Sequence, residues 1–282
     1  MALSPFTLRS SLLACLCAAT TATSSGTPDP TQIVLQNGRS IPLTSLTLQG
    51  DNLVVQSDIG MFKAGQAIPL QSADHVFGEK PAAINEAVAF LLTGKPQDAQ
   101  RLLDSVVSEL RITAKIPGNF WIEAARTLLI ARALVADAPG CVELGKEITE
   151  ATPAQGTDSF VTLGRALLMP PTIKLDDRLA ALRDLSTGKL PANVSAYAAF
   201  FRANLLKKEK RTPEALEAFL SVPCLFPSGG LILNAAAEIQ AADFLNAEGR
   251  REEAIALLTS AVREAAGTFL VNDANKRLDS LK

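Results

Sequence analysis

Three copies of one short pattern constrain the fold of this chain more than any other feature of its sequence. Each copy begins at a turn residue, has an alanine five positions later, and has a large apolar residue four positions after the alanine. The copies are Gly94–Ala99–Leu103, Lys210–Ala215–Phe219 and Gly249–Ala254–Leu258. A glycine just past a helix caps it in the left-handed conformation, and a proline fits the first turn of the next helix. The pattern therefore predicts pairs of antiparallel helices that approach closely at the alanine.

The residues around each copy resemble a known repeat. Small residues stand seven positions before the three turn residues, namely Ala87, Ala203 and Ala242. Pro227 follows Lys210 by seventeen residues. This combination resembles the tetratricopeptide repeat, or TPR, a helix–turn–helix unit of about 34 residues. The chain departs from the family in the first helix, where tryptophan, leucine and tyrosine are usual and the first copy has Ala83, Glu86 and Phe90.

The spacing of the copies predicts how many helix pairs the chain contains. The first two copies are 116 residues apart and the last two are 39 apart, so two degenerate pairs fit between the first two copies. We therefore expect about five pairs over residues 82–268, within a helical-repeat domain of residues 81–282. The resemblance implies a mainly α fold, a right-handed α-solenoid closed by a capping helix. The predicted helices are 82–93, 96–112, 120–137, 140–150, 158–169, 175–186, 192–208, 213–225, 231–248, 252–265 and 271–281.

Residues 31–78 alternate with a period of two and predict a small β module. Asn37-Gly38 is a strong hairpin signal, and Gly50-Asp51-Asn52 predicts a second turn. The segment Ile-Pro-Leu occurs at 41–43 and again at 68–70, and proline within a strand indicates a sheet edge. We expect four or five short strands in a small sheet or an SH3-like barrel that packs on the first helix pair, with Pro81 at the boundary.

The first thirty residues predict export from the cytoplasm. Arg9 precedes the short apolar run 12–19, and small residues follow it, which is the layout of a secretory signal peptide over residues 1–22. Residues 23–30 are a polar linker. An alternative is a lipoprotein in which Cys15 carries a lipid anchor, because Leu12-Leu13-Ala14-Cys15 resembles a lipoprotein processing box.

Composition and isolated motifs argue against catalysis and nucleic-acid binding. The formal charge is −2 and the pI is about 5.6, whereas a nucleic-acid binder needs a basic surface. The single histidine, His75, cannot form a paired-histidine metal site. Ser186 and Lys189 have the spacing of a serine–lysine nucleophile pair, but the serine ends a predicted helix. We predict no catalytic residue, no cofactor and no metal. Cys141 and Cys224 are expected to be buried free thiols.

The resemblance also implies a binding groove, because the first helix of each TPR pair lines a concave surface that takes extended peptides. The corresponding residues here are Tyr197, Phe200, Asn204, Lys207, Lys208, Ile239, Asp243 and Asn246. The alternative interpretation is that Tyr197, Phe200 and Phe201 belong to the core. Trp121 is expected to be buried between pairs.

The sequence thus predicts an exported scaffold that binds another protein or an extended peptide segment in a bacterial periplasm or cell envelope. It predicts no nucleic-acid partner and no transmembrane span. Two alternatives remain, a membrane-tethered assembly factor and an enzyme with a cryptic site. The second would require convergent polar residues in a pocket.

Overall fold

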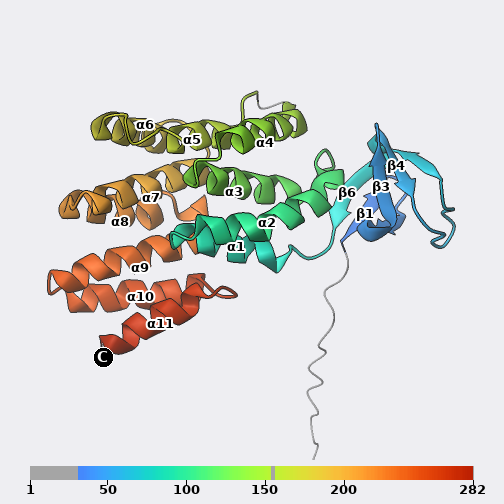
Figure 1. The fold of residues 1–282 in the computed structure, drawn as a ribbon. Helices are drawn as coiled ribbons and strands as arrows, with labels where there is room; N and C mark the ends of the chain where they lie inside the picture. Colours follow the sequence, from blue (N-terminus) through green and yellow to red (C-terminus); the bar gives the residue numbers. More distant parts are fainter. Residues whose placement is uncertain (1–30, 154–155, 282) are drawn as a thin grey trace, which may run out of the picture.

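The fold was analysed in a computed structural model, which describes residues 31–153 and 156–281. The predicted signal peptide, the linker and Cys15 lie outside the described residues. Within them, the chain forms a small β module at one end of a larger helical part (Figure 1). This agrees with the predicted mainly α chain with an N-terminal β module.

The β module consists of two three-stranded antiparallel sheets rather than one sheet of four or five strands. One has the strand order β2-β1-β6 and the other β3-β4-β5. The predicted Asn37-Gly38 hairpin is confirmed, because the strands on either side of it pair with Ile33 opposite Ile41. The strands are β1 (Gln32–Leu35), β2 (Ser40–Pro42), β3 (Leu46–Gln49), β4 (Asn52–Val55), β5 (Ala67–Pro69) and β6 (Ala73–Phe77).

The two Ile-Pro-Leu segments carry the chain between the sheets. Each supplies the end of an edge strand, β2 or β5, and then a single 3₁₀ turn, at Leu43–Ser45 or Leu70–Ser72. The next strand, β3 or β6, belongs to the other sheet. The predicted edge positions are therefore confirmed. The physical reason is that proline has no N–H to donate to a further strand.

The connection between the first two helix pairs anchors the β module. Ile116, in that connection, is 2% exposed and belongs to the apolar core of the β module. The N–H of Val76 in β6 donates to the carbonyl of Pro117 over 2.9 Å. Trp121, at the start of the next helix, is 1% exposed, which confirms the prediction that it is buried.

The helical part follows the predicted boundaries to within three residues. The boundaries could be predicted because apolar residues recur with the helical period and glycine or proline stands at most of the connections between helices. The helices are α1 (Ala82–Leu92), α2 (Pro96–Leu110), α3 (Trp121–Leu134), α4 (Ala138–Ala151), α5 (Ser159–Leu167), α6 (Leu175–Thr187), α7 (Ala192–Lys208), α8 (Thr212–Leu225), α9 (Leu231–Ala247), α10 (Arg251–Glu264) and α11 (Leu270–Ser280).

The turn residues of the three copies share one backbone conformation. Gly94, Lys210 and Gly249 have φ of 77°, 60° and 80°. In each turn the following N–H donates to a carbonyl five residues back, as from Arg250 to Leu245 over 2.9 Å. The α3–α4 turn has the same conformation and bonding at Ala136, whose φ is 63°. This fourth turn was missed because alanine rarely occupies the left-handed region.

The first helices of the five pairs, α1, α3, α5, α7 and α9, form a closed ring. α1 contacts α3, α3 contacts α5, α5 contacts α7, α7 contacts α9, and α9 contacts α1. Figure 1 shows α1 beside α9 although the whole middle of the chain lies between them. At the same seam, Phe90 of α1 lies 5.1 Å from Phe269 just before α11, between ring centroids. In an open solenoid each repeat contacts only its neighbours, so this contact between the first and fifth pairs departs from the expected array.

Candidate functional site

The N-terminal parts of the five ring helices α1, α3, α5, α7 and α9 surround one pocket, with a volume of about 520 Å³. Every ring helix contributes from its N-terminal half, and the end of α10 completes the wall. Representative lining residues, in helix order, are Asn85, Arg126, Phe160, Tyr197, Ile232 and Glu264. The ring therefore brings together residues from the first to the fifth helix pair at one end.

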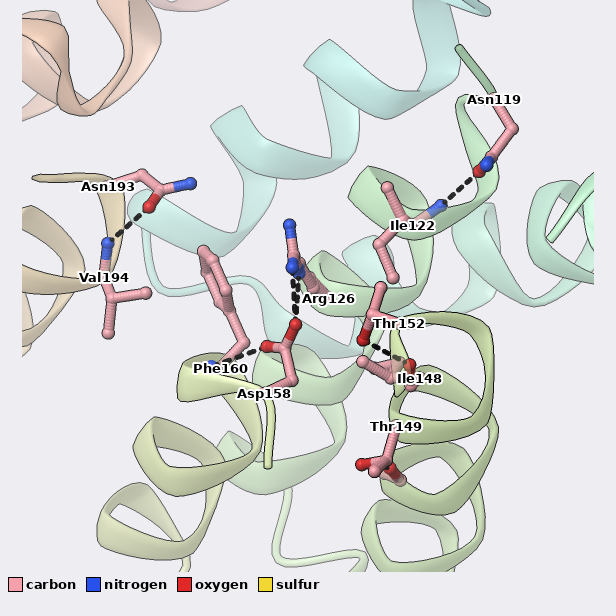
Figure 2. A network of polar contacts seen from close by, with 11 residues as sticks. Asn119, Ile122, Arg126, Ile148, Thr149, Thr152, Asp158, Phe160, Asn193 and Val194 are labelled. Atoms are coloured by element: carbon pink, nitrogen blue, oxygen red, sulfur yellow. Dashed lines mark hydrogen bonds and ion pairs between the residues drawn. The ribbon is translucent and has the colours of Figure 1, made fainter. Parts of the chain in front are cut away.

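A buried ion pair joins α3 to the start of α5, and its arginine lines the pocket. Asp158 is 2% exposed and caps α5, because its carboxylate accepts from the N–H of Phe160 over 2.8 Å. Arg126 of α3 donates to the same carboxylate, with Nε 3.1 Å from Oδ2. Its guanidinium also lies 5.2 Å from the Phe160 ring centroid. Figure 2 shows Arg126 above Asp158, with Phe160 beside the ion pair and Asn193 beyond Phe160. Removing one partner would leave a buried charge uncompensated.

A second ion pair closes the side of the pocket near the β module. Nζ of Lys80, just before α1, lies 2.9 Å from Oε1 of Glu123 in the first turn of α3. A carboxylate there also interacts favourably with the helix dipole. These two ion pairs engage the charges that α1, α3 and α5 bring to the pocket.

Tyr197 presents a neutral phenol to the pocket. Burial, together with the charge of Glu123, raises the pKa of Tyr197 well above its ordinary range, so the hydroxyl keeps its proton at neutral pH. The ring is held edge-on against Phe160, 5.9 Å between centroids, and stacks on Phe201. In the part of the chain that the structure describes, this hydroxyl has no hydrogen-bond partner, so it can donate to a bound group.

The residues predicted for a peptide groove do not line one surface. Tyr197 reaches the pocket, but Phe200 and Ile239 are 0% and 1% exposed and belong to the core. Asn204 and Lys208 line a separate cleft of about 190 Å³ at the C-terminal ends of α3, α5 and α7.

The remaining groove residues lie along the C-terminal halves of α7 and α9. Lys207 donates to Gln240 over 2.5 Å, Asp243 pairs with Arg277 of α11, and Asn246 is exposed. The resemblance placed all eight residues on one face. The inner faces of the ring helices point toward one another. The residues in the middle of each ring helix are therefore buried in the core.

Sequence reasoning missed the pocket, because the helix starts around it carry no distinguishing local signal. Helices α1, α7 and α9 begin after Pro81, Pro191 and Gly230 with no side-chain cap. Ser, Thr, Asp or Asn would ordinarily cap such starts. A missing cap does not mark this end of the array, however, because the outer helices α2, α6, α8 and α10 also begin without a side-chain cap.

Other clefts in the described residues are less suited to recognition. One of about 400 Å³ lies between α3, α4 and α5, with a largely apolar wall that includes Gly145 and Gly164. Another of about 170 Å³ lies between the β module and the helices and includes Trp121. Neither gathers polar groups from as many helices as the ring pocket.

The cysteines and the isolated motifs lie away from the pocket. Cys141 and Cys224 are both free, but only Cys141 is buried, so the prediction of a buried thiol at Cys224 is wrong. Cys224 follows Pro223 near the end of the outer helix α8. Burial raises the pKa of the Cys141 thiol to about 11, which keeps it protonated and unreactive.

His75 and the serine–lysine motif are also remote from the pocket. His75 lies in β6, with its Nδ1 2.8 Å from Oδ2 of Asp74. Ser186 donates to the carbonyl of Arg183 at the end of α6. No group of three or more His, Cys, Asp or Glu side chains in the described residues is placed to hold a metal ion. Of the helices that the structure describes, none has the length and hydropathy needed to cross a bilayer.

Comparison with known proteins does not assign this chain to a family. Its sequence matches no protein-family model, and no curated protein is similar to it. Function therefore has to be argued from the pocket.

Proposed function

We propose that this protein is an exported, TPR-like scaffold that binds a segment of a partner protein in the ring pocket and performs no catalysis. The observation that carries the proposal is the convergence of five helix starts on one pocket of about 520 Å³. A concave pocket with an apolar wall and a few fixed polar groups is the usual form of a ligand site. Export is proposed from the signal-peptide layout of residues 1–22.

The polar groups of the pocket are suited to recognition. Arg126 and Lys80 are each engaged with a carboxylate, and the Tyr197 hydroxyl is a neutral donor. The backbone carbonyls of a peptide segment accept hydrogen bonds from such donors. The apolar side chains of the same segment cover Val88 and Leu233 in the pocket wall. Affinity would come mainly from the aromatic and apolar contacts, and orientation from the polar ones.

The right-handed TPR-like solenoid is likewise proposed, on the support of the shared turns. Four of the five pairs have a left-handed turn residue with the same hydrogen bonds. The alanines five residues after the three predicted turns are 0% exposed, as close helix pairing requires. The contact between α1 and α9 then makes this array more tightly wound than the family's open superhelix.

Site-specific photo-crosslinking in cells tests the binding site. A benzophenone amino acid at Ile232, in the pocket wall, should give a discrete adduct with one partner. The matched controls are Met61 on the β module and Val142 on α4, which are 59% and 62% exposed. Asn85→Trp should fill the pocket and abolish the Ile232 adduct without changing the circular-dichroism spectrum. An adduct from Met61 alone would instead place binding on the β module.

A further inference from the structure

The fifth helix pair contains several buried side-chain oxygens that accept no hydrogen bond. In the described residues, the buried side-chain oxygens that lack a hydrogen-bond partner are Asn234 Oδ1, Glu238 Oε2 and Glu264 Oε2. Asn234 and Glu238 are only 3% and 6% exposed. Buried polar atoms are nearly always paired in folded proteins, so three unpaired acceptors in one helix pair need an explanation.

Glu238 of α9 and Glu264 of α10 interact across the pair, and Asn234 lies one turn before Glu238 on α9. Asn234 and Glu238 are four residues apart on α9 and share a face. α9 and α10 pack antiparallel around the Gly249 turn, which brings Ser260 opposite Glu238 and Glu264 opposite Asn234. Ser260 hydrogen-bonds Glu238, and the charge of Glu264 acts on Glu238. The amide N of Asn234 donates to the Pro227 carbonyl over 3.0 Å, which fixes the orientation that leaves Oδ1 unpaired.

Only Glu264 of the cluster lines the pocket, and Asn234 and Glu238 lie buried behind it, so a ligand reaches their oxygens only by displacing the Glu264 side chain. Besides Ser260 and Glu264, the group that acts on the charge of Glu238 is Arg263, which is exposed and lies 3.4 Å from the Ser260 hydroxyl through Nη2. Neither Glu238 nor Glu264 forms an ion pair in the described part of the chain. Burial raises the pKa of Glu238 to about 7, and the charge of Glu264 adds to the rise.

We infer that Asn234, Glu238 and Glu264 form a receptor for a primary ammonium group, carried by the partner segment as a lysine side chain or a free amino terminus. An ammonium has three N–H donors, which equals the number of unpaired oxygens. Calcium and magnesium fit this site less well, because each takes six or more oxygen ligands. An arginine side chain also fits less well, because three oxygens cannot pair all five N–H donors of its planar guanidinium. Val88 and Leu233 in the same wall can cover the alkyl stem of a lysine.

This inference rests on the proposed function, since it names the chemistry of the partner at the same pocket. Tyr197 is the only tyrosine of the chain, so 3-fluorotyrosine labelling gives a single fluorine NMR signal in the pocket. Nα-acetyl-lysine methylamide should shift this signal in a saturable way. Nα-acetyl-norleucine methylamide, which lacks the ammonium, should not. Norleucine methylamide with a free amino group carries only an α-ammonium. A shift with this probe would indicate a receptor for chain termini, and no shift would indicate a receptor for lysine side chains.

Variants of the full chain locate the ammonium. Glu264→Gln should weaken binding of the lysine probe at least tenfold, whereas Glu252→Gln, an exposed change on the same helix, should leave it unchanged. The affinity of the wild-type protein for the lysine probe should fall several-fold between pH 8 and pH 6, because Glu238 gains a proton. Glu238→Gln should remove this pH dependence.

Several results would overturn the inference. One is equal binding of the lysine and norleucine probes, and another is unchanged binding by Glu264→Gln. A saturable calcium response without a lysine response would also overturn it, in favour of a metal site. If Ile232 captures a partner but the lysine probe has no effect, the ammonium receptor fails and the proposed function stands. If the probe binds but no partner is captured at Ile232, the proposed function fails instead.

Discussion

The third and fifth helix pairs occupy comparable places in the ring but are held together differently. In α9–α10 the chain turns at Gly249, and Ala242, Ala254 and Leu258 pack the two helices with at most 2% exposure. In α5–α6 the connection contains Pro170-Pro171 and no residue with positive φ. α6 buries only Leu179 and Leu182.

The difference shows that the repeat pattern determines how the two helices of a pair pack together. It does not determine which helices form the ring, because the third pair lacks the pattern and α5 still belongs to the ring. α5 contacts α3 and α7, and α6 contacts α7, so the third pair is held by its neighbours. The regular fifth pair is well packed and yet carries the unpaired acceptors. We infer that the scaffold is specified by the turns and small residues, whereas recognition depends on polar residues that the pattern leaves free.

Truncating the core of each pair should give the largest effects and a clear contrast. Leu258→Ala should reduce the free energy of unfolding by about 3–4 kcal/mol, because α10 is enclosed by well-packed partners that cannot collapse into the cavity. Leu179→Ala should cost about 2 kcal/mol, because α6 lies at the margin and can relax. Urea melts measure both losses. Equal losses would mean that the third pair is as tightly packed as the fifth.

The pH dependence of stability should reside in the fifth pair. Glu238 has a pKa of about 7 in the folded protein against an ordinary value of 4.5, so the folded state binds this proton more tightly than the unfolded state. The resulting stabilisation is fully present below pH 4.5 and is lost as the pH rises to 7. Its size is roughly 3 kcal/mol, because one pKa unit corresponds to about 1.4 kcal/mol.

Glu238→Gln should therefore be more stable than the wild type at pH 8, with the difference vanishing near pH 4.5. Thermal melts across this range measure it, with Glu252→Gln as the control. A wild-type advantage at pH 8 would show that the charged carboxylate is satisfied in the folded state.

Overpacking the fifth pair should distinguish its inner and outer faces. Ala254→Leu should destabilise the protein by about 1–3 kcal/mol, because the 0% exposed alanine sits where α10 meets α9. Ala256→Leu, the same substitution at an exposed position of the same helix, should change stability by less than about 0.5 kcal/mol. Similar losses at both positions, measured by urea melts, would be incompatible with the α9–α10 packing.

The smallest expected effects concern the turns. Ala136→Gly should stabilise the α3–α4 turn by about 0.5–1 kcal/mol, because glycine adopts the left-handed conformation without strain. Gly249→Ala should destabilise the fifth pair by a similar amount, since its φ is 80° although nothing lies near an added Cβ. Differential scanning calorimetry can resolve the opposite signs. Changes of the same sign would show that the two turns are not equivalent.

Much of the fold could be predicted from local sequence, whereas the site could not. The helix boundaries follow from proline, glycine and periodicity, and the burial of Ala99, Ala215 and Ala254 follows from their spacing. The ring closure depends on contacts between α1 and α9, which no local pattern encodes. Phe200 and Ile239 were assigned to a groove for the same reason, because an open array exposes inner faces that a closed ring buries.

Fluorine NMR of the two single aromatic reporters tests the central claim most directly. Tyr197 lines the ring pocket and Trp121, the only tryptophan, lines the cleft beside the β module. The protein would be labelled with 3-fluorotyrosine and 5-fluorotryptophan and titrated with a synthetic peptide of the partner segment crosslinked at Ile232. The account predicts that the Tyr197 signal shifts saturably while the Trp121 signal stays in place. A shift of Trp121 with no change at Tyr197 would contradict it.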